Sequence, residues 1–331
     1  MKLYKLYYLF ILILFIGLIG CDSDSTGPDP EINETEVILE YLENVLQFPY
    51  GGFVVEAQAV RTTLLASPAT QYIVDIRTAA DYATGYIPGA VQVNFADLYN
   101  HIKGINTGGY ERIVIVCYTG QSSAYAVALL RAAGIPNAIS LKWGMSAWHE
   151  DLAGPWLNNR SNARATQFVK TPAPAKPPKG ELPEINTGLT EPVDIIDARV
   201  AQLFSAGYGP AAINHSALYQ NLNGHRIINY WPTNLYTGLG HIQGAFNYPP
   251  SPNPWKSDSD LLTLSTEMPN VIYCYTGQTS SYLSGYLRIL GYDSRSLLYG
   301  GNGMIYDVMK DANTPNTFIP ETEIKNYDYT K

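Results

Sequence analysis

Residues 113–123 read IVIVCYTGQSS and residues 271–280 read VIYCYTGQTS, so the chain contains one arrangement twice. Each copy is a short β-branched run that ends in a cysteine, Cys117 or Cys274, and continues through a small polar loop into a helical pattern. Backbone N–H groups of such a loop, together with the helix dipole, converge on the sulfur. They favour the thiolate, which is the nucleophilic form of cysteine. The two copies therefore predict two domains, each built around a reactive thiol.

Length and composition agree with two folded domains. A chain of 331 residues is long enough for about two domains, each with its own core. Apolar residues make up 46% and charged residues 15%, which is typical of a folded globular chain. The 29 acidic residues outnumber the 21 basic ones, so the charge balance argues against a nucleic-acid partner.

The N-terminus has the pattern of a targeting segment. Two lysines precede an apolar run over residues 6–19, which is shorter than the ~20 residues that a transmembrane helix needs. This order is typical of a secretory signal, and the ending Leu-Ile-Gly-Cys21 resembles a bacterial lipobox. The resemblance implies a signal peptide over residues 1–20, a lipidated Cys21, and a polar tether over residues 21–33. An ordinary signal peptide with an incidental cysteine is the alternative.

A lipobox predicts where the protein lies. We expect a lipoprotein of the bacterial cell envelope, held at a membrane by the lipid anchor and facing the periplasm or the exterior. With Cys21 assigned to the lipid, only Cys117 and Cys274 remain. Exported proteins usually pair their cysteines as disulfides. A bridge here would need the two loops to meet with Cα atoms within ~7 Å, so we expect two free, working thiols instead.

The second half of the chain repeats the first. A shift of 157 residues aligns the halves without a gap from the cysteine strand onward. The coinciding pairs include Gly120 with Gly277, Gln121 with Gln278, Arg131 with Arg288, and Gly144 with Gly301. So many coincidences at one offset indicate a duplication.

Upstream of the cysteines, residues 72–77 (YIVDIR) and 194–199 (DIIDAR) are each expected to form a strand ending in Asp-x-Arg. The pairs Asp75–Arg77 and Asp197–Arg199 are interpreted as structural ion pairs. Gly85 follows Asp75 by 10 positions, whereas Gly240 follows Asp197 by 43. This difference predicts an insertion in the second domain, roughly at residues 205–239. A loop of that length is usually a lid, a binding loop or disordered.

The proline-rich stretch at residues 171–180 predicts an extended linker between the halves. The expected boundaries are residues 34–159 for the first domain, 160–181 for the linker and 182–331 for the second domain. Short apolar strands alternate with helical segments, which predicts an α/β fold with a mainly parallel sheet flanked by helices. Sites in such sheets lie at the carboxyl ends of strands, where both cysteines fall.

Four motifs, in the same order in both halves, together resemble a rhodanese-like domain. In the first half they are Asp75-Ile-Arg77, residues 85–90 (GYIPGA), residues 117–122 (CYTGQS) and residues 141–148 (LKWGMSAW). In the second half they are Asp197-Ala-Arg199, residues 240–245 (GHIQGA), residues 274–279 (CYTGQT) and residues 298–301 (LYGG). The likeness to a tandem rhodanese-like protein covers nearly all of the chain outside the signal, the linker and the expected insertion.

The resemblance implies sulfurtransferase activity. Cys117 and Cys274 would take a sulfane sulfur from a donor such as thiosulfate, polysulfide or a persulfide, and hold it as a cysteine persulfide. They would pass it to cyanide, a thiol or a protein acceptor. The substrate-binding loops would be Tyr118, Thr119, Gly120, Gln121 and Ser122, and Tyr275, Thr276, Gly277, Gln278 and Thr279. No cofactor is expected, and no metal, because the histidines are not spaced as ligands.

Two other classes of function were weighed. A rhodanese-fold binding or sulfur-sensing module at the cell envelope would keep the fold without turnover. It would use the expected insertion to contact a partner. Neither loop carries the Arg or Lys that many members of the family place after the cysteine, which argues against thiosulfate as the preferred donor. A cysteine phosphatase would need a Cys-x5-Arg loop that clamps phosphate. Positions 123 and 280 are serines, which argues against that class.

Overall fold

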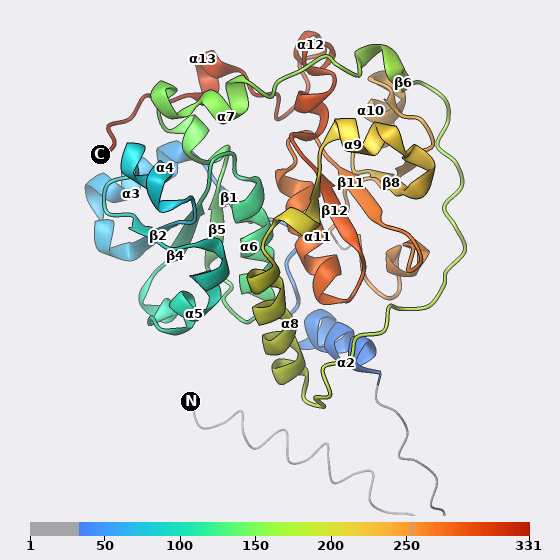
Figure 1. The fold of residues 1–331 in the computed structure, drawn as a ribbon, viewed down its shortest axis with the longest axis horizontal. Coiled ribbons are helices and arrows are strands. Elements are labelled where there is room, and N and C mark those ends of the chain that lie inside the picture. The colour runs from blue at the N-terminus through green and yellow to red at the C-terminus, as the bar shows by residue number, and fades with distance from the viewer. Residues whose placement is uncertain (1–32, 253) are drawn as a thin grey trace, which may run out of the picture. The chain divides into compact units, whose positions relative to one another are not determined.

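The computed structural model describes residues 33–331 apart from residue 253, so the expected signal peptide, Cys21 and the tether as far as residue 32 lie outside the described residues. Two five-stranded sheets form the framework (Figure 1). Their orders are β1-β5-β4-β2-β3 and β7-β12-β11-β8-β10, and neighbouring strands within each sheet are parallel. Helices flank both sheets (Figure 1). The predicted α/β fold of two domains, each a parallel sheet flanked by helices, is confirmed.

The first sheet consists of β1 (Val54–Val55), β2 (Gln71–Asp75), β3 (Val91–Gln92), β4 (Arg112–Val116) and β5 (Ala138–Leu141). The α-helices of this half are α2 (Glu34–Glu40), α3 (Ala57–Ala66), α4 (Ala79–Thr84), α5 (Leu98–Lys103), α6 (Gln121–Ala132) and α7 (Gly154–Leu157). A π-helical turn, η2 (Tyr41–Val45), extends α2.

The second sheet consists of β7 (Ala212–Ile213), β8 (Arg226–Asn229), β10 (Phe246–Asn247), β11 (Asn270–Tyr273) and β12 (Ser294–Leu297). Its α-helices are α8 (Pro192–Ala206), α9 (His215–Gln220), α10 (Thr233–Gly238), α11 (Gln278–Ile289), α12 (Tyr306–Asp311) and α13 (Pro320–Glu323). Two further strands, β6 (Phe168–Val169) and β9 (His241–Ile242), form a small antiparallel pair.

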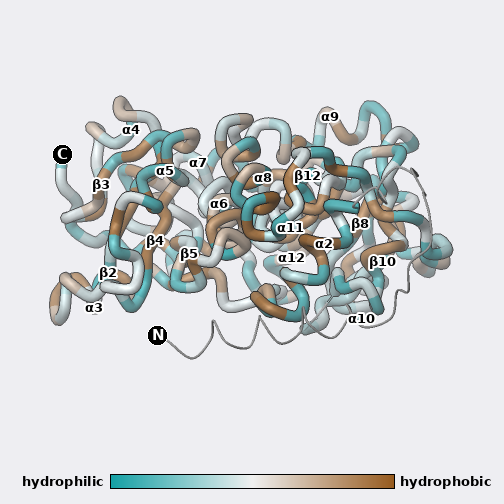
Figure 2. Tube along the Cα trace, turned by 90° about the horizontal axis from the view of Figure 1, so that it is seen from below, coloured by the Kyte–Doolittle hydropathy of each residue, from teal (hydrophilic) through white to brown (hydrophobic). Residues whose placement is uncertain are grey.

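The strands that carry the cysteines lie at the centre of each sheet. Residues 113–116 of β4 and all four residues of β11 are buried. A central parallel strand is covered on both faces, so it requires a continuous apolar run instead of alternation. In Figure 2 the trace of β4 and β5 has mostly the colour of hydrophobic residues. The apolar runs that precede Cys117 and Cys274 therefore fix the depth of both cysteines.

Helices α6 and α11 pack against each other between the two sheets (Figure 1). Their contact is close because α11 has Gly285 where a Cβ would overlap the side chain of Ala128. One hydrophobic cluster contains residues of α6, α11, α2 and α8 together. The two domains thus share a core.

Each domain is completed by the segment that follows the other domain. After the first domain, β6 pairs with β9 of the second, with Phe168 opposite Ile242. The end of the chain returns to the first domain, where Thr330 bridges to Tyr86 and Phe318 packs on Trp156 (Figure 1). We call residues 160–169 and 318–331 the two straps. The structure thereby revises the expected boundaries, since both straps lie on the domain opposite to the one that precedes them.

The predicted insertion at residues 205–239 is wrong. This range holds β7, β8, α9 and α10, and both strands belong to the parallel sheet. They are the counterparts of β1, β2, α3 and α4 in the first domain, because the strand orders match. The second domain therefore carries its opening elements there and no added lid.

The error arose from the Asp-x-Arg match. Residues 194–199 lie in helix α8 and not in a strand. Pro192 stands in the first helical turn, where its missing N–H costs nothing, and buried Ile196, Val200 and Leu203 recur at helical spacing. The counterpart of β2 is β8, in which Asn229 stands where the first domain has Asp75.

The alignment without a gap is also corrected. The offset of 157 holds through α6 and α11, but β5 and β12 match at 156, as Leu141 and Leu297 show. The turn that leaves α11 is one residue shorter than the turn that leaves α6. Among the described residues, no helix is long and apolar enough to cross a membrane.

Candidate active site

Cys117 lies in the loop between β4 and α6. Its sulfur accepts hydrogen bonds from the backbone N–H of Gly120 at 3.1 Å and lies 3.3 Å from Oγ of Ser123. Gly120 has φ of 83°, a left-handed conformation that glycine adopts without strain, and this turns its N–H toward the sulfur. The Cys117 side chain is buried, with 2% of its surface exposed.

Cys274 has the same surroundings with additional donors. The N–H of Gly277 lies 3.2 Å from its sulfur and the N–H of Ser280 lies at 3.4 Å. The hydroxyls of Ser280 and Thr276 are 3.5 and 3.8 Å away. Cys274 is 3% exposed. Both cysteines are free in the structure.

The serine that faces each sulfur is held by a second serine. Oγ of Ser123 lies 2.7 Å from Oγ of Ser140, and Oγ of Ser280 lies 2.7 Å from Oγ of Ser296. All four hydroxyls are buried in their domain. These serines are not among the site residues predicted from the sequence. Their recurrence at matching places in the two repeats is the signal that could have found them.

The loop arrangement can stabilise negative charge on sulfur. Each cysteine is buried, but the amides that follow it point toward the sulfur and not away from it. Each sulfur also lies near the N-terminus of a 12-residue helix, where the helix dipole is positive. A thiolate, or a persulfide that carries the same charge, would find these donors already in place.

The other loop residues do not all face the sulfur. The hydroxyl of Tyr118 donates to Asp81, and the ring of Tyr275 stacks on Trp231 at 5.3 Å. Hydrogen bonding to Tyr118 and Thr78 holds the pKa of Asp81 below its ordinary value. Ser122 and Thr279 are half-buried and have no recorded hydrogen bond to either sulfur. The two tyrosines therefore form walls of the site and are not donors to it.

The glutamines of the two loops reach into the opposite domain. Gln278 donates from Nε2 to the carbonyl oxygen of Gly120 at 3.2 Å, and its Oε1 accepts from the N–H of Trp143 at 3.2 Å. Oε1 of Gln121 accepts from the N–H of Tyr299 at 2.8 Å. A Cβ at Gly120 would overlap the side chain of Gln278. The two cysteine loops, which the sequence did not bring together, thus cover each other. We call these reciprocal contacts the glutamine clasp.

Two partly buried tyrosines, Tyr299 and Tyr208, have raised pKa values. Burial chiefly raises the pKa of Tyr299 to about 12, and negative charge on Cys117, in the other domain, adds to the rise. Burial likewise raises the pKa of Tyr208, and charge on either Cys117 or Cys274 contributes. The hydroxyl of Tyr208 lies 2.7 Å from Oγ of Ser281, in the first turn of helix α11.

The two Asp-x-Arg motifs make different contacts. Asp75 and Arg77 form a buried ion pair at 2.7 Å, and Arg77 also donates to the carbonyl of Gly85. Asp197 does not pair with Arg199. Asp197 bonds to Lys103 at 2.8 Å, because helix α8 directs it toward the first domain. In the second domain Asn229 holds the equivalent turn by accepting from the N–H of Trp231.

Metal ligation has no support in the described part of the chain. It contains no group of three or more His, Cys, Asp and Glu side chains that could hold a metal ion.

Comparison with known proteins identifies the family. The rhodanese-like domain family matches residues 58–151 and again residues 183–303, which together make up more than half of the chain. Each match contains one of the two cysteine loops. The chain belongs to the rhodanese-like family and carries two such domains in tandem.

Curated relatives are sulfurtransferases. The thiosulfate sulfurtransferase GlpE of Shewanella oneidensis is 38% identical over 78 residues, which cover 24% of this chain and 75% of the relative. GlpE of Pseudomonas fluorescens is 33% identical over 76 residues, covering 23% and 68%. These relatives support membership of a sulfurtransferase family.

Solved structures of the same kind are also similar. A rhodanese-like domain protein from Staphylococcus aureus is 33% identical, covers 28% of this chain and 86% of its own, and has a TM-score of 0.25. A thiosulfate sulfurtransferase from Pseudomonas aeruginosa is 17% identical over 90% of this chain, with a TM-score of 0.29. This chain spans about half of that structure's length, 48%.

Proposed function

We propose that the protein is a sulfurtransferase that moves sulfane sulfur through a persulfide on Cys117, Cys274 or both. The observation that carries this proposal is the set of N–H and hydroxyl donors within 3.1–3.5 Å of each sulfur at the start of a helix. Family membership and the similarity to thiosulfate sulfurtransferases support the reaction class.

The reaction has two steps. The cysteine thiolate attacks the outer sulfur of the donor, forms an S–S bond, and the donor leaves with the electron pair of the broken bond, as sulfite if the donor is thiosulfate. The acceptor then attacks the terminal sulfur of the persulfide and regenerates the thiolate. Each step transfers one sulfur atom and needs no added oxidant. The loop donors hold the charge on sulfur before and after each transfer.

The neutral loops bear on the choice of donor. Arg77 lies 5.9 Å from the ring centre of Tyr118, but it is already paired with Asp75. An anionic donor such as thiosulfate thus meets backbone and hydroxyl donors and no free guanidinium. This favours an organic persulfide, or a protein that carries a persulfide, because that group bears one negative charge where thiosulfate bears two.

A second candidate is a binding or sulfur-sensing module without turnover. The observation that favours it is burial: both sulfurs are 2–3% exposed and the glutamine clasp covers the loops. For catalysis, the loops must separate enough to admit a donor. A sensor would use that same separation as its signal.

The test is sulfur transfer to cyanide with thiosulfate, polysulfide and glutathione persulfide as separate donors. The variants are Cys117→Ala, Cys274→Ala and the double variant, with Leu65→Ala, an exposed position, as the matched control. The enzyme predicts turnover with at least one donor, lost in the double variant and retained in the control. Turnover that survives in the double variant, or none with any donor, contradicts it. A mass increase of one sulfur atom on a cysteine peptide, without turnover, indicates the sensor.

We also propose that the protein is a lipoprotein of the cell envelope, on the strength of the lipobox-like sequence before Cys21. Expression in a bacterial host with detergent phase separation tests this. The wild-type chain is expected in the detergent phase and Cys21→Ala in the aqueous phase. Equal partitioning of the two contradicts lipid attachment.

A further inference from the structure

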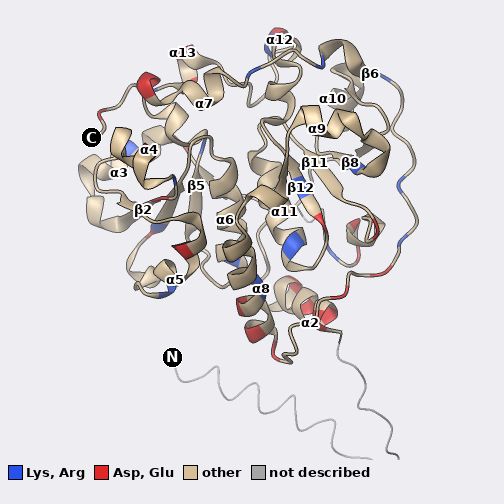
Figure 3. Cartoon of the chain, in the orientation of Figure 1, with Lys and Arg blue, Asp and Glu red and all other residues tan. Residues whose placement is uncertain are grey.

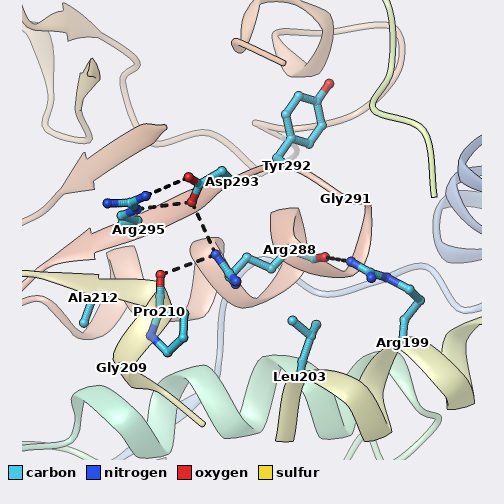
Figure 4. A pocket seen from close by; sticks show the side chains of 10 residues that line it. All are labelled: Arg199, Leu203, Gly209, Pro210, Ala212, Arg288, Gly291, Tyr292, Asp293 and Arg295. Atoms are coloured by element: carbon cyan, nitrogen blue, oxygen red, sulfur yellow. Dashed lines mark hydrogen bonds and ion pairs between the residues drawn. The ribbon is translucent and has the colours of Figure 1, made fainter. Parts of the chain in front are cut away.

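A cavity of about 490 Å³ opens at the amino-terminal ends of β7 and β12. Its wall comes from helix α8, the last turn of α11, and the two loops that enter these strands (Figure 4). Cys274 follows the carboxyl end of β11, so this cavity lies at the opposite end of the same sheet. It is therefore separate from the sulfur site. Its volume is within the range of small-molecule pockets, about 300–1,000 Å³.

Three arginines and one aspartate line the cavity: Arg199, Arg288, Arg295 and Asp293. Asp293 serves two of the arginines, with Arg295 at 2.8 Å and Arg288 at 3.4 Å (Figure 4). Among the described residues Arg199 forms no ion pair. It donates to the carbonyls of Arg288 at 2.7 Å and Ile289 at 3.3 Å and to Oε1 of Gln202 at 2.6 Å. Figure 3 shows basic residues at the lower end of α11 and on β12 in a mostly uncharged region. The cavity has an excess of positive charge.

The positive charges of Arg199 and Arg288 are close enough to affect each other. Burial, and next the charge of Arg288, lower the pKa of Arg199. The helix dipole of α11 stabilises one cation at its C-terminus. It does not account for two more arginines around one carboxylate. An anion placed among them would relieve the repulsion.

The repeat supplies an internal comparison. Arg131, the counterpart of Arg288 in the first domain, donates to the carbonyls of Ala138, Gly51 and Gly52 at 2.9, 3.1 and 2.7 Å. All of its nitrogens are thereby satisfied. The arginine of the first domain is thus a structural tie between helix, strand and loop.

Arg288 lacks these ties. Its hydrogen bonds to Pro210, Asp293 and Ser294 are all 3.4 Å and all come from Nη1. Its Nε is buried and makes no hydrogen bond of good geometry in the described structure, and the Tyr125 hydroxyl, which also makes none, lies close to Arg288. Burial raises the pKa of Tyr125, and the nearby Arg288 cation opposes the rise. Buried donors without partners are costly, and native sites usually fill them.

We propose that Arg199, Arg288 and Arg295 form a binding site for a tetrahedral dianionic oxyanion, either a free ion such as phosphate or sulfate or the same group on a small ester. Arginine binds such groups through paired N–H donors. The anion would take the donors of Arg288 that the protein leaves weakly bonded and would balance the charge of Arg199. Asp293 limits the affinity because it competes for Arg288 and Arg295.

Isothermal titration of the full chain with inorganic phosphate, sulfate and phenyl phosphate tests the site, at constant ionic strength set with chloride. Saturable binding is expected. Arg288→Gln is expected to weaken it about tenfold or more, the loss of a charge-assisted hydrogen bond. Asp293→Asn is expected to tighten it roughly threefold to tenfold by removing the competing carboxylate. Arg61→Gln, a partly exposed arginine on α3, is the matched control and should bind as wild type.

The sources of the group are separated by the probes. Tighter binding of phenyl phosphate than of inorganic phosphate identifies an ester as the ligand, and equal binding identifies the free ion. Thermal unfolding without anion shows whether each variant is folded, and Arg288→Lys provides a variant that keeps the charge. No saturable binding by the wild type, or binding unchanged in both Arg288→Gln and Arg295→Gln, overturns the proposal.

Discussion

Gln278 of the second domain donates to the carbonyl oxygen of Gly120 in the first domain, within the loop that surrounds Cys117. Gln121 makes the reciprocal contact by accepting from the N–H of Tyr299. A glutamine side chain of each half therefore packs against the cysteine loop of the other half. Access to one site depends on the domain that carries the second.

The glutamine clasp predicts a crossed pattern of thiol reactivity. Gln278→Ala should increase alkylation of Cys117 by iodoacetamide more than alkylation of Cys274. Gln121→Ala should favour Cys274, because its contact lies on the second domain. We expect roughly a tenfold change, equivalent to one lost hydrogen bond of about 1.4 kcal/mol. Peptide mass spectrometry after timed alkylation measures both rates at once. An equal increase in the alkylation rate of both cysteines in either variant would contradict this pattern. It would mean that the variant loosens both cysteine loops together.

The buried serines at the sulfurs should affect the chemistry of the thiol. Ser123→Ala removes a hydroxyl 3.3 Å from Cys117, and Ser280→Ala removes one 3.5 Å from Cys274. We expect each change to lower the persulfide formation rate at its own cysteine about tenfold, since a donor to charged sulfur is lost. Cys274 keeps the N–H of Ser280, so the loss there should be the smaller one. Single-turnover persulfide formation measures this, and Thr62→Ala on exposed α3 is the control. An unchanged rate of persulfide formation at both cysteines would show that the hydroxyls contribute packing and do not stabilise charge on the sulfur.

Glu34 should make stability depend on pH. Burial raises its pKa, but hydrogen bonds from Thr187 and Gly188 outweigh burial and hold the pKa below the usual value of 4.5. The folded state thus prefers the charged form. This contribution is complete above the unfolded value and disappears as the pH falls through the folded pKa.

Glu34→Gln should therefore lower the free energy of unfolding by about 1–3 kcal/mol at neutral pH. The difference from wild type should shrink as the pH falls from the usual value of 4.5 through the lowered pKa of the folded state, because the wild-type carboxyl then becomes protonated. Denaturant unfolding at several pH values measures it. Glu36→Gln, on the exposed side of the same helix, is the control. A difference that stays constant down to pH 3 would contradict the assignment.

Phe318 should stabilise the first domain although it follows the second in the sequence. Its ring is fully buried, stacked on Trp156 and edge-on to Trp143. Phe318→Ala should cost about 3–5 kcal/mol, as large-to-small core changes do. Phe318→Leu, which keeps most of the volume, should cost less and serves as the control. Hydrogen exchange should show the loss of protection in β4 and β5. A loss confined to the second domain would contradict the packing described here.

Much of the fold and of the site could be predicted from sequence because the repeat is densest at the cysteines. The apolar runs before Cys117 and Cys274, the glycines after them and the helices that follow recur together, and the structure places all of them as expected. The start of the second domain could not be located in this way. There Asn229 and Trp231 replace Asp75 and Arg77, and the Asp-x-Arg match at residues 197–199 lies in helix α8 instead.

The contacts between the domains could not be predicted from the sequence, for a different reason. A strand pattern says which residues are buried but not which distant surface buries them. The glutamine clasp and the straps depend on how two sheets meet across α6 and α11, and a few small residues such as Gly285 decide that. Asp197 illustrates the limit: its sequence neighbour Arg199 suggested a partner, whereas Lys103, 94 positions away, provides it.

The exchanged straps have a consequence for how this chain can be divided. A fragment that stops before residue 160 would expose the apolar surface that residues 318–331 cover, and a fragment that starts after the proline-rich stretch would leave β9 unpaired. Duplication produced two similar halves, but each half is covered by the strap that follows the other half in the sequence. Neither half could therefore be lost, or expressed by itself, unless the strap that covers the remaining half is kept.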